Sequence, residues 1–198
     1  MNSRFSNEDE FAAFKKELSA RLKDRETRQL DNPGYRPSAV NILLMNREGE
    51  LCVLLTKRTD KVSTHKGQIS FPGGGYDEDD ADILATVYRE TREEVGIPAE
   101  KIECIGRFDD YISLFGFHIA CFVGAIPYPC EYDFNEEEID DYVEAPLSVF
   151  IERKYDRIEH YNIKGHDIEV YHYYYNGYEI WGLTARILTD FAVSVLKD

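Results

Sequence analysis

Residues 54–75 read LLTKRTDKVSTHKGQISFPGGG, and residues 89–96 read RETREEVG. The first segment is a basic loop that ends in a run of glycines, and the second segment is rich in carboxylates. Glycines let a backbone turn tightly and approach a ligand closely, whereas Glu and Arg favour helices. These two segments therefore predict a glycine turn followed by a helix from about residue 80 to residue 96.

The predicted helix has a mostly apolar stripe with an acidic edge beside it. At about 100° per residue, the stripe contains Leu84, Val87, Tyr88, Thr91 and Val95. Glu90 and Glu94 lie one turn apart, so both carboxylates can point to the same place. Glu93 lies further round the helix, and Arg89 precedes it at the i,i+4 spacing that allows an ion pair. The arginine could therefore orient one acid without neutralising all three.

Clustered carboxylates repel one another, and a hard divalent cation relieves that repulsion. We therefore expect Mg²⁺ or Mn²⁺ to be held by Glu90 and Glu94. The alternative is a solvated helix face, because Arg and Glu are common on exposed helices. The glycine turn directly before the helix favours a ligand site, since a solvated helix does not require such a turn.

These residues resemble the Nudix box, Gly-x5-Glu-x7-Arg-Glu-U-x-Glu-Glu-x-Gly-U, in which U is a bulky aliphatic residue. Its second half is matched by Arg89, Glu90, Glu93, Glu94, Gly96 and Ile97, with Thr91 in place of the aliphatic residue. The first half departs from the pattern. A box that starts at Gly75 puts Ala81 at the first glutamate position, whereas one that starts at Gly74 puts Asp80 there and leaves one extra residue before Arg89. We prefer the start at Gly74.

The preceding stretch resembles the signature of the coenzyme A pyrophosphatase branch, roughly LLTxR followed by HxGQ and FPGG. Its positions are filled by Leu54, Leu55, Thr56, Arg58, His65, Gly67, Gln68, Phe71, Pro72, Gly73 and Gly74. Members of that branch commonly carry the one-residue insertion and an aspartate-rich turn, which Asp77, Asp79 and Asp80 supply here. Residues 181–186, WGLTAR, resemble a C-terminal segment of the same branch. The resemblance thus extends from about residue 36 to residue 190.

The resemblance implies an α/β fold, the Nudix α/β/α sandwich with a mixed β-sheet. It implies metal-dependent hydrolysis of coenzyme A or acyl-coenzyme A to adenosine 3′,5′-bisphosphate and 4′-phosphopantetheine or its acyl derivative. The expected metal ligands are Glu90, Glu94, Glu93 and the Gly74 carbonyl, and Glu93, oriented by Arg89, is also a candidate base. Some Nudix enzymes take a further ligand or base from a distant loop, and Glu138 is our choice in the acidic run at 135–139.

The chain is strongly acidic overall, and one basic segment could attract an anionic substrate. The net charge of −15 argues against a nucleic-acid surface or binding to an anionic membrane. Four basic residues and one acidic residue between Thr56 and Gln68 give that segment a local charge of +3 with its histidine neutral. We expect substrate phosphates near Lys57, Arg58, His65 and Gln68, although a solvated loop is the alternative.

The rest of the chain predicts one domain with a helical extension. Residues 1–34 are expected to form a helix capped by Ser6 that packs on the domain or forms a homodimer, with Phe11, Phe14, Leu18 and Leu22 repeating at helical spacing. Residues 35–198 form the expected Nudix hydrolase domain. Strands are predicted at 39–45, 51–55, 102–111 and 116–126, a tyrosine-rich hairpin at 155–163 and 167–180, and a closing helix at 184–196. The tyrosines at 171–178 could stack on adenine or pack a sheet face.

Cysteine usage and the N-terminal composition predict a cytoplasmic protein. Cys52, Cys104, Cys121 and Cys130 show no paired spacing, so we expect reduced core residues, and the first thirty residues contain no long apolar stretch.

Two other functions remain open at this point. One is a Nudix hydrolase for another nucleoside diphosphate derivative, such as ADP-ribose or a dinucleotide. The other is a non-catalytic nucleotide-binding module, which would have no need to retain Glu90, Glu93 and Glu94 together.

Overall fold

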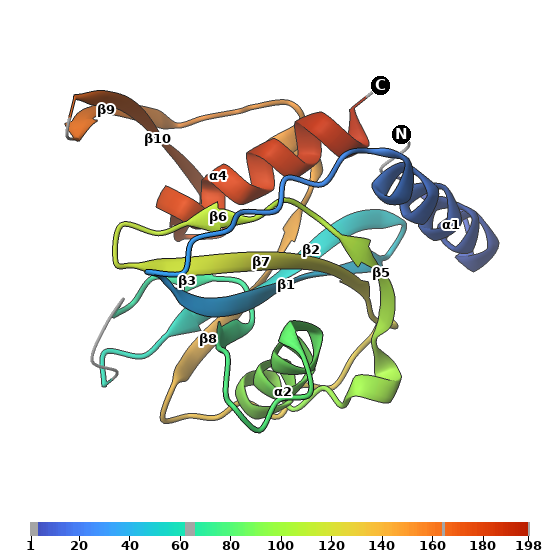
Figure 1. Cartoon of the computed structure of the whole chain (residues 1–198). Helices are drawn as coiled ribbons and strands as arrows, with labels where there is room; N and C mark the ends of the chain where they lie inside the picture. Colours follow the sequence, from blue (N-terminus) through green and yellow to red (C-terminus); the bar gives the residue numbers. More distant parts are fainter. Residues whose placement is uncertain (1–3, 62–65, 164, 198) are drawn as a thin grey trace.

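A computed structural model describes residues 4–61, 66–163 and 165–197 of the chain (Figure 1). Its main sheet has eight strands in the described residues, in the order β3-β2-β1-β7-β5, while β4 pairs with β1, β6 with β7 and β8 with β2. Their bounds are β1 (Arg36–Arg47), β2 (Glu50–Arg58), β3 (Ile69–Ser70), β4 (Gly73–Gly75), β5 (Glu103–Arg107), β6 (Tyr111–Ile112), β7 (Phe117–Ala125) and β8 (Ile139–Pro146). Because β1 and β7 are parallel and the other pairs are antiparallel, the sheet is mixed.

Helices cover both faces of this sheet. They are α1 (Glu8–Asp24), α2 (Ile83–Val95), α3 (Ser148–Ile151) and α4 (Gly182–Phe191), with a 3₁₀ turn η1 (Ala99–Lys101) and a π turn η2 (Ala192–Leu196). In Figure 1, α1 and α4 lie above the sheet and α2 lies below it. The predicted α/β/α sandwich is therefore confirmed.

Strand β1 shows why both faces must be covered. Successive residues of a strand point to opposite faces. Ile42 and Leu44 pack in the core with α1 and α4, whereas Leu43 and Met45 pack with Val95 of α2. A strand buried on both faces is a continuous apolar run, as residues 42–45 are.

The N-terminal helix differs from the prediction at its start. Asn7, rather than Ser6, caps α1: its Oδ1 accepts a hydrogen bond from the Glu10 amide at 3.0 Å, and the Ser6 amide donates to Glu10 Oε2 at 2.7 Å. The predicted stripe of Phe11, Phe14, Leu18 and Leu22 is buried in the main core cluster. This stripe is used for packing within the chain; the homodimer and the division at residue 34 stay predictions.

Three further expectations change. The predicted hairpin is a three-stranded sheet of β9 (Arg157–Ile163), β10 (His166–Tyr175) and β11 (Tyr178–Trp181), and β8 was not predicted. Only Cys52 and Cys121 are buried, because Cys104 is exposed and Cys130 is half-buried. The predicted glycine turn is the short strand β4, which pairs with β1.

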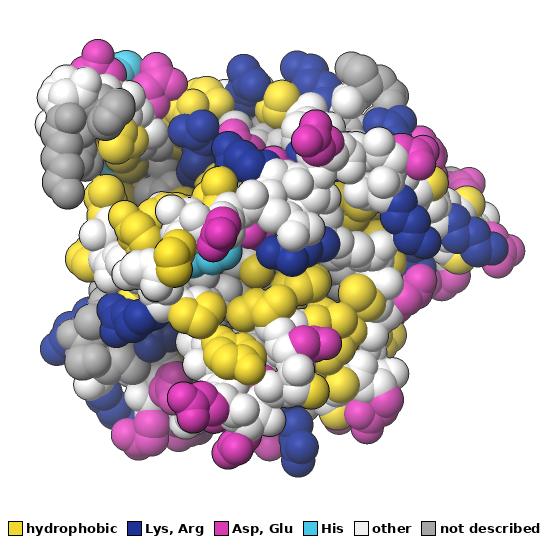
Figure 2. All heavy atoms as spheres, viewed as in Figure 1, with side chains coloured by type: hydrophobic (Ala, Val, Ile, Leu, Met, Phe, Trp, Pro, Cys, Tyr) yellow, Lys and Arg dark blue, Asp and Glu magenta, His cyan; other side chains and the backbone are white. Residues whose placement is uncertain are grey.

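The described surface mixes both signs of charge. Figure 2 shows Lys, Arg, Asp and Glu side chains spread around hydrophobic atoms in the middle of one face. In the described part of the chain, no helix is both long and apolar enough to cross a membrane.

Candidate active site

Helix α2 is placed by strong signals at both ends. Asp82 caps its N-terminus, with Oδ1 accepting from the Ala85 amide at 2.8 Å, and Gly96 ends it in the left-handed conformation at φ 71°. Thr86, Val87, Thr91, Glu94 and Val95 are buried. Glu94 is thus the one carboxylate of the predicted acidic edge that lies in the buried surface of this helix.

The backbone of β4 approaches this helix closely. A Cβ atom at Gly73 would lie 2.3 Å from the Ala39 carbonyl oxygen, and one at Gly74 would lie 2.5 Å from the carboxyl carbon of Glu90. Side chains at these positions would overlap the neighbouring strand and the acid. The two glycines therefore allow β4 to pack beside the carboxylates.

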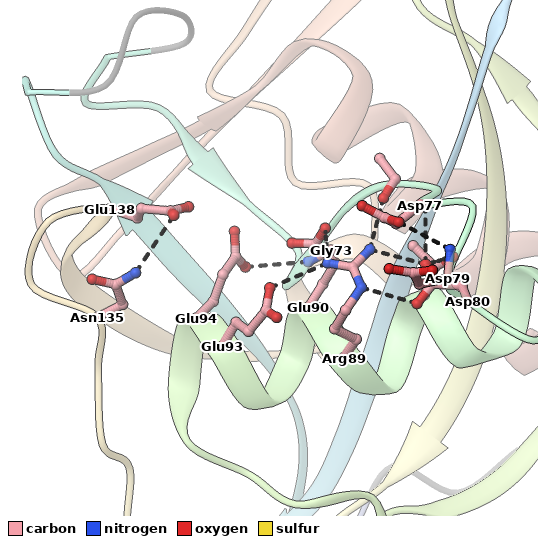
Figure 3. Close-up of polar contacts among 12 residues, drawn as sticks. Gly73, Asp77, Asp79, Asp80, Arg89, Glu90, Glu93, Glu94, Asn135 and Glu138 are labelled. Atoms are coloured by element: carbon pink, nitrogen blue, oxygen red, sulfur yellow. Dashed lines mark hydrogen bonds and ion pairs between the residues drawn. The ribbon is translucent and has the colours of Figure 1, made fainter.

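Glu94 is 2% exposed and has only limited charge compensation (Figure 3). Its Oε2 accepts from the Gly73 amide at 3.2 Å, and Arg58 Nη1 lies 3.4 Å from its Oε1. Burial raises the pKa of Glu94 to about 8; the Gly73 hydrogen bond and the Arg58 charge oppose the rise, and the charges of Glu90 and Glu138 add to it.

Glu90 is half-buried, with 17% of its side chain exposed, and its pKa moves in the same direction. Burial raises its pKa, the contacts with Arg89 oppose the rise, and the charges of Glu93 and Glu138 add to it. Two neighbouring carboxylates with raised pKa values, one buried and one half-buried, mark a place where added positive charge is stabilising. This donor set fits a divalent cation held between Glu90 and Glu94.

The protein supplies only part of such a cation's ligands. In the described residues, no three acidic, histidine or cysteine side chains converge into a complete metal site. Mg²⁺ commonly binds one or two carboxylates and completes its octahedron with water and substrate phosphate. Gly74 packs against the Glu90 carboxylate, and the role of its carbonyl as a metal ligand stays a prediction.

Arg89 orients more than one acid, which corrects the expectation that it would fix Glu93 alone. Its Nη1 donates to Glu93 Oε2 at 3.1 Å and to Glu90 Oε1 at 2.7 Å. Its Nε and Nη2 also donate to the two oxygens of Asp80 at 2.9 and 3.0 Å, and Nη2 donates to the Gly75 carbonyl at 2.9 Å. Arg89 therefore ties the glycine strand to the acidic helix.

Asp80 is a positioning residue that the sequence reasoning identified only through the box alignment. Its carboxylate is nearly buried and also accepts from Thr86 Oγ1 at 2.8 Å and from the Asp77 amide at 3.1 Å. The Arg89 hydrogen bond is the main cause that holds the pKa of Asp80 well below its usual range. Ala81 has no acceptor side chain, so these contacts agree with the box start at Gly74.

Glu138 lies on the Glu94 side of the acidic cluster (Figure 3). Asn135 Nδ2 donates to Glu138 Oε1 at 3.4 Å, and the Glu138 carbonyl accepts from the Thr59 amide at 2.8 Å. The Asn135 amide donates to the Glu94 carbonyl at 3.1 Å, which joins this loop to the end of α2. The structure thus brings Glu138 near enough for its charge to act on Glu90 and Glu94, although Glu138 is 44 positions after Glu94 in the sequence.

The predicted phosphate-binding residues do not share one environment. Lys57 and Arg58 are neighbours on β2, and their side chains diverge: Lys57 Nζ donates to Asp140 at 2.6 Å, whereas Arg58 reaches Glu94. Gln68 is half-buried, and its carbonyl accepts from the Arg58 amide at 3.0 Å. His65 lies outside the described residues. The phosphate-binding roles of all four stay predictions.

Comparison with known proteins identifies the family. The NUDIX domain profile matches residues 35–173. An uncharacterized Nudix hydrolase NudL from Enterobacter sp. (strain 638) is 38% identical over 165 residues, covering 81% of this chain and 83% of the relative. A NudL from Escherichia coli O1:K1 / APEC is 33% identical with the same coverage.

Solved structures agree with the fold. A crystal structure of a C. elegans Ap4A hydrolase binary complex matches at a TM-score of 0.50 with 17% identity, covering 58% of this chain and 83% of that one. At this identity the similarity shows the fold alone. With the profile match, the relatives and the acidic helix α2 in agreement, the chain belongs to the Nudix hydrolase family.

Proposed function

We propose that this Nudix hydrolase splits the diphosphate of coenzyme A or acyl-coenzyme A into adenosine 3′,5′-bisphosphate and 4′-phosphopantetheine or its acyl derivative. The observation that carries the diphosphatase activity is a pair of carboxylates, the buried Glu94 and the half-buried Glu90, packed against the backbone of Gly73 and Gly74. The narrower choice of coenzyme A rests on the similarity of residues 54–74 to the coenzyme A pyrophosphatase signature.

Nudix hydrolases generally act with divalent cations, and we propose Mg²⁺ or Mn²⁺ for this one. Glu90, Glu94 and the Gly74 carbonyl would hold the ion, with Glu93 as a further ligand. When bound, it neutralises negative charge that develops on the phosphoryl oxygens. The carboxylates of the protein remain in place for this role because Arg89 and the Gly73 amide orient them.

Water attacks phosphorus, the bond to the bridging oxygen breaks, and a carboxylate must accept the proton of the water. Glu138 suits this task better than Glu93. Its charge acts on both Glu90 and Glu94, and its loop is hydrogen-bonded to the end of α2, whereas the Glu93 side chain is 57% exposed and is held in an ion pair by Arg89. Because phosphoryl transfer passes through a loose transition state that leaves little covalent chemistry to the enzyme, the protein mainly positions the reactants and stabilises charge. We also propose that the reaction takes place in the cytoplasm.

The test is product analysis by mass spectrometry after incubation of the purified protein with coenzyme A and Mn²⁺ or Mg²⁺. We expect adenosine 3′,5′-bisphosphate from the wild type and none above background from Glu94→Gln, an isosteric change that removes the charge. If the folded wild-type protein leaves coenzyme A intact and hydrolyses ADP-ribose or a dinucleotide, the proposed substrate is wrong and the enzyme acts on another nucleoside diphosphate derivative.

A further inference from the structure

The outward face of the three-stranded sheet carries a pair of aromatic rings. In β10 and β11, Tyr173 and Ile180 are fully buried and point to the core. Because side chains alternate along a strand, His172 and Trp181 point to the opposite face, and they are directly paired across the two strands. Their rings stack with centroids 5.7 Å apart and planes 5° apart.

The two rings differ in their exposure. His172 is 3% exposed, whereas Trp181 is 39% exposed. One side of the indole is thus covered by the imidazole, and a substantial part of it remains open to a ligand. Of the tyrosines considered for stacking, Tyr173 is buried and Tyr171, Tyr175 and Tyr178 pack against the core. Tyr174 is 53% exposed, and its hydroxyl donates to Glu179.

Hydrogen bonds through Glu179 hold the His172 imidazole, which backs the indole, in place. Glu179 Oε1 is 2.8 Å from His172 Nδ1, and it accepts from the Tyr174 hydroxyl at 2.7 Å and from Arg157 Nη2 at 3.2 Å. A stacking surface that is already ordered loses little conformational entropy when a ligand binds. Rigid aromatic side chains are common binding surfaces for nucleobases, since every base has a π-face.

Contacts connect the ring pair to the acidic site. Three residues after Trp181, Thr184 Oγ1 donates to the Ile69 carbonyl of β3 at 3.0 Å, and β11 packs along β3. Strand β3 pairs with β2, and the last residue of β2 is Arg58, which reaches Glu94. Trp181 is the last residue of β11, and β11 packs on β3 at the edge of the main sheet. The indole is therefore connected through β3 and β2 to Arg58 and Glu94.

We infer that Trp181, backed by His172, is the surface on which the adenine ring of the substrate stacks. This assignment rests on the proposed function, because coenzyme A supplies the purine. Trp181 determines affinity for the base-bearing half of the substrate and takes no part in bond breaking. The pantetheine half, which has no aromatic ring, does not contact it.

Trp181 is the sole tryptophan of the chain, so its fluorescence reports directly on this contact. The full-length protein is titrated with adenosine 3′,5′-bisphosphate, which carries the base, and with 4′-phosphopantetheine, which does not. We expect saturable quenching by the first compound. We expect no change with the second at concentrations that inhibit coenzyme A hydrolysis.

Kinetics of two variants separate stacking from a structural role. Trp181→Leu should raise KM for coenzyme A by roughly 5- to 150-fold and change kcat little. This range is the change in affinity expected when the stacking of one base on an aromatic ring is lost. Trp181→Phe retains a ring and should recover most of the affinity. A general loosening of the fold would instead lower kcat and the melting temperature of both variants.

The outcomes separate this inference from the proposed function. Coenzyme A hydrolysis without any emission response to saturating adenosine 3′,5′-bisphosphate overturns the base site and leaves the proposed function standing. An emission response from a protein that does not hydrolyse coenzyme A supports the base site and overturns the proposed function. The wild-type titration decides the question even if Trp181→Leu does not fold.

Discussion

Gly74→Ala should displace one predicted metal ligand while leaving the fold intact. The new Cβ would lie 2.5 Å from the Glu90 carboxyl carbon and 2.6 Å from each carboxylate oxygen, whereas ordinary contact begins at 3.4 Å. The difference between 3.4 and 2.5 Å requires the carboxylate to move by about 0.9 Å. Arg89 holds Glu90 Oε1 at 2.7 Å, so the displaced acid also strains that ion pair.

The expected cost falls on turnover rather than on stability. A misplacement of about 1 Å in a positioned catalytic group can lower the rate roughly a hundredfold. Gly74 does not have a positive φ, and the atoms that must move are the end of a flexible side chain. The free energy of unfolding should therefore change little.

The neighbouring glycines provide matched controls. A Cβ at Gly75 meets nothing within 4 Å, so Gly75→Ala should keep both activity and melting temperature. Gly73 has φ 152° and its Cβ would lie 2.3 Å from the Ala39 carbonyl oxygen, so Gly73→Ala should destabilise the fold itself. The assay is the rate of coenzyme A hydrolysis across a range of Mg²⁺ concentrations, with thermal unfolding in parallel. A Gly74→Ala protein with wild-type turnover and an unchanged Mg²⁺ requirement would refute the placement of Glu90 at the metal.

Three other predictions concern the base, the basic residues and acid stability. Glu138→Gln should lower kcat by roughly 10²- to 10⁴-fold and Glu93→Gln by less, measured at saturating Mg²⁺; equal losses would remove Glu138 as the base. Arg58→Ala should lower kcat/KM for coenzyme A and for ADP-ribose alike, because Arg58 contacts Glu94. Lys57→Ala, whose side chain reaches Asp140 instead, should lower kcat/KM for coenzyme A only. The same ratio of losses on the two substrates in both variants would contradict these separate roles. Burial tends to raise the pKa of Asp109, but hydrogen bonds from Arg25 and the Arg28 amide lower it overall. The ionised carboxylate therefore stabilises the fold above its unfolded pKa of 3.8. This stabilisation is lost as the pH falls below 3.8 and through the lower pKa of the folded state. Asp109→Asn should therefore lower the melting temperature at pH 7 and have a smaller effect near pH 3; a pH-independent difference would show that the charge is not responsible.

The sequence predicted the helices whose ends and buried faces depend on residues close together in the chain. The start of α2 was predicted at about residue 80, whereas Asp82 caps it and the helix begins at Ile83. Its end at Gly96 agrees with the predicted end at residue 96, and its buried side follows from the spacing of Val87, Thr91 and Val95. The apolar stripe of α1 was found for the same reason. In each case, the period of 3.6 residues is present in the sequence before any tertiary contact forms.

Strand β8 was missed because its pattern is mixed. Ile139, Val143 and Ala145 are buried, but Asp140, Asp141 and Glu144 make the segment appear as part of an acidic loop. Pairing with β2 stabilises this strand, and that pairing joins residues about 90 positions apart. No window of local sequence contains such a contact.

The amino-acid sequence by itself determined the acidic helix, the glycine segment before it and the family, because these depend on residue type and spacing. Only the tertiary structure decided what each charge contacts: Arg58 turns to Glu94 and Lys57 to Asp140, Arg89 gathers Asp80 with Glu90, and Glu138 arrives from a distant loop. The pairing of Trp181 with His172 is likewise decided by strand register. Charge and ring contacts depend on distances of a few ångströms between residues remote in the chain, and packing of the sheet against its helices sets those distances.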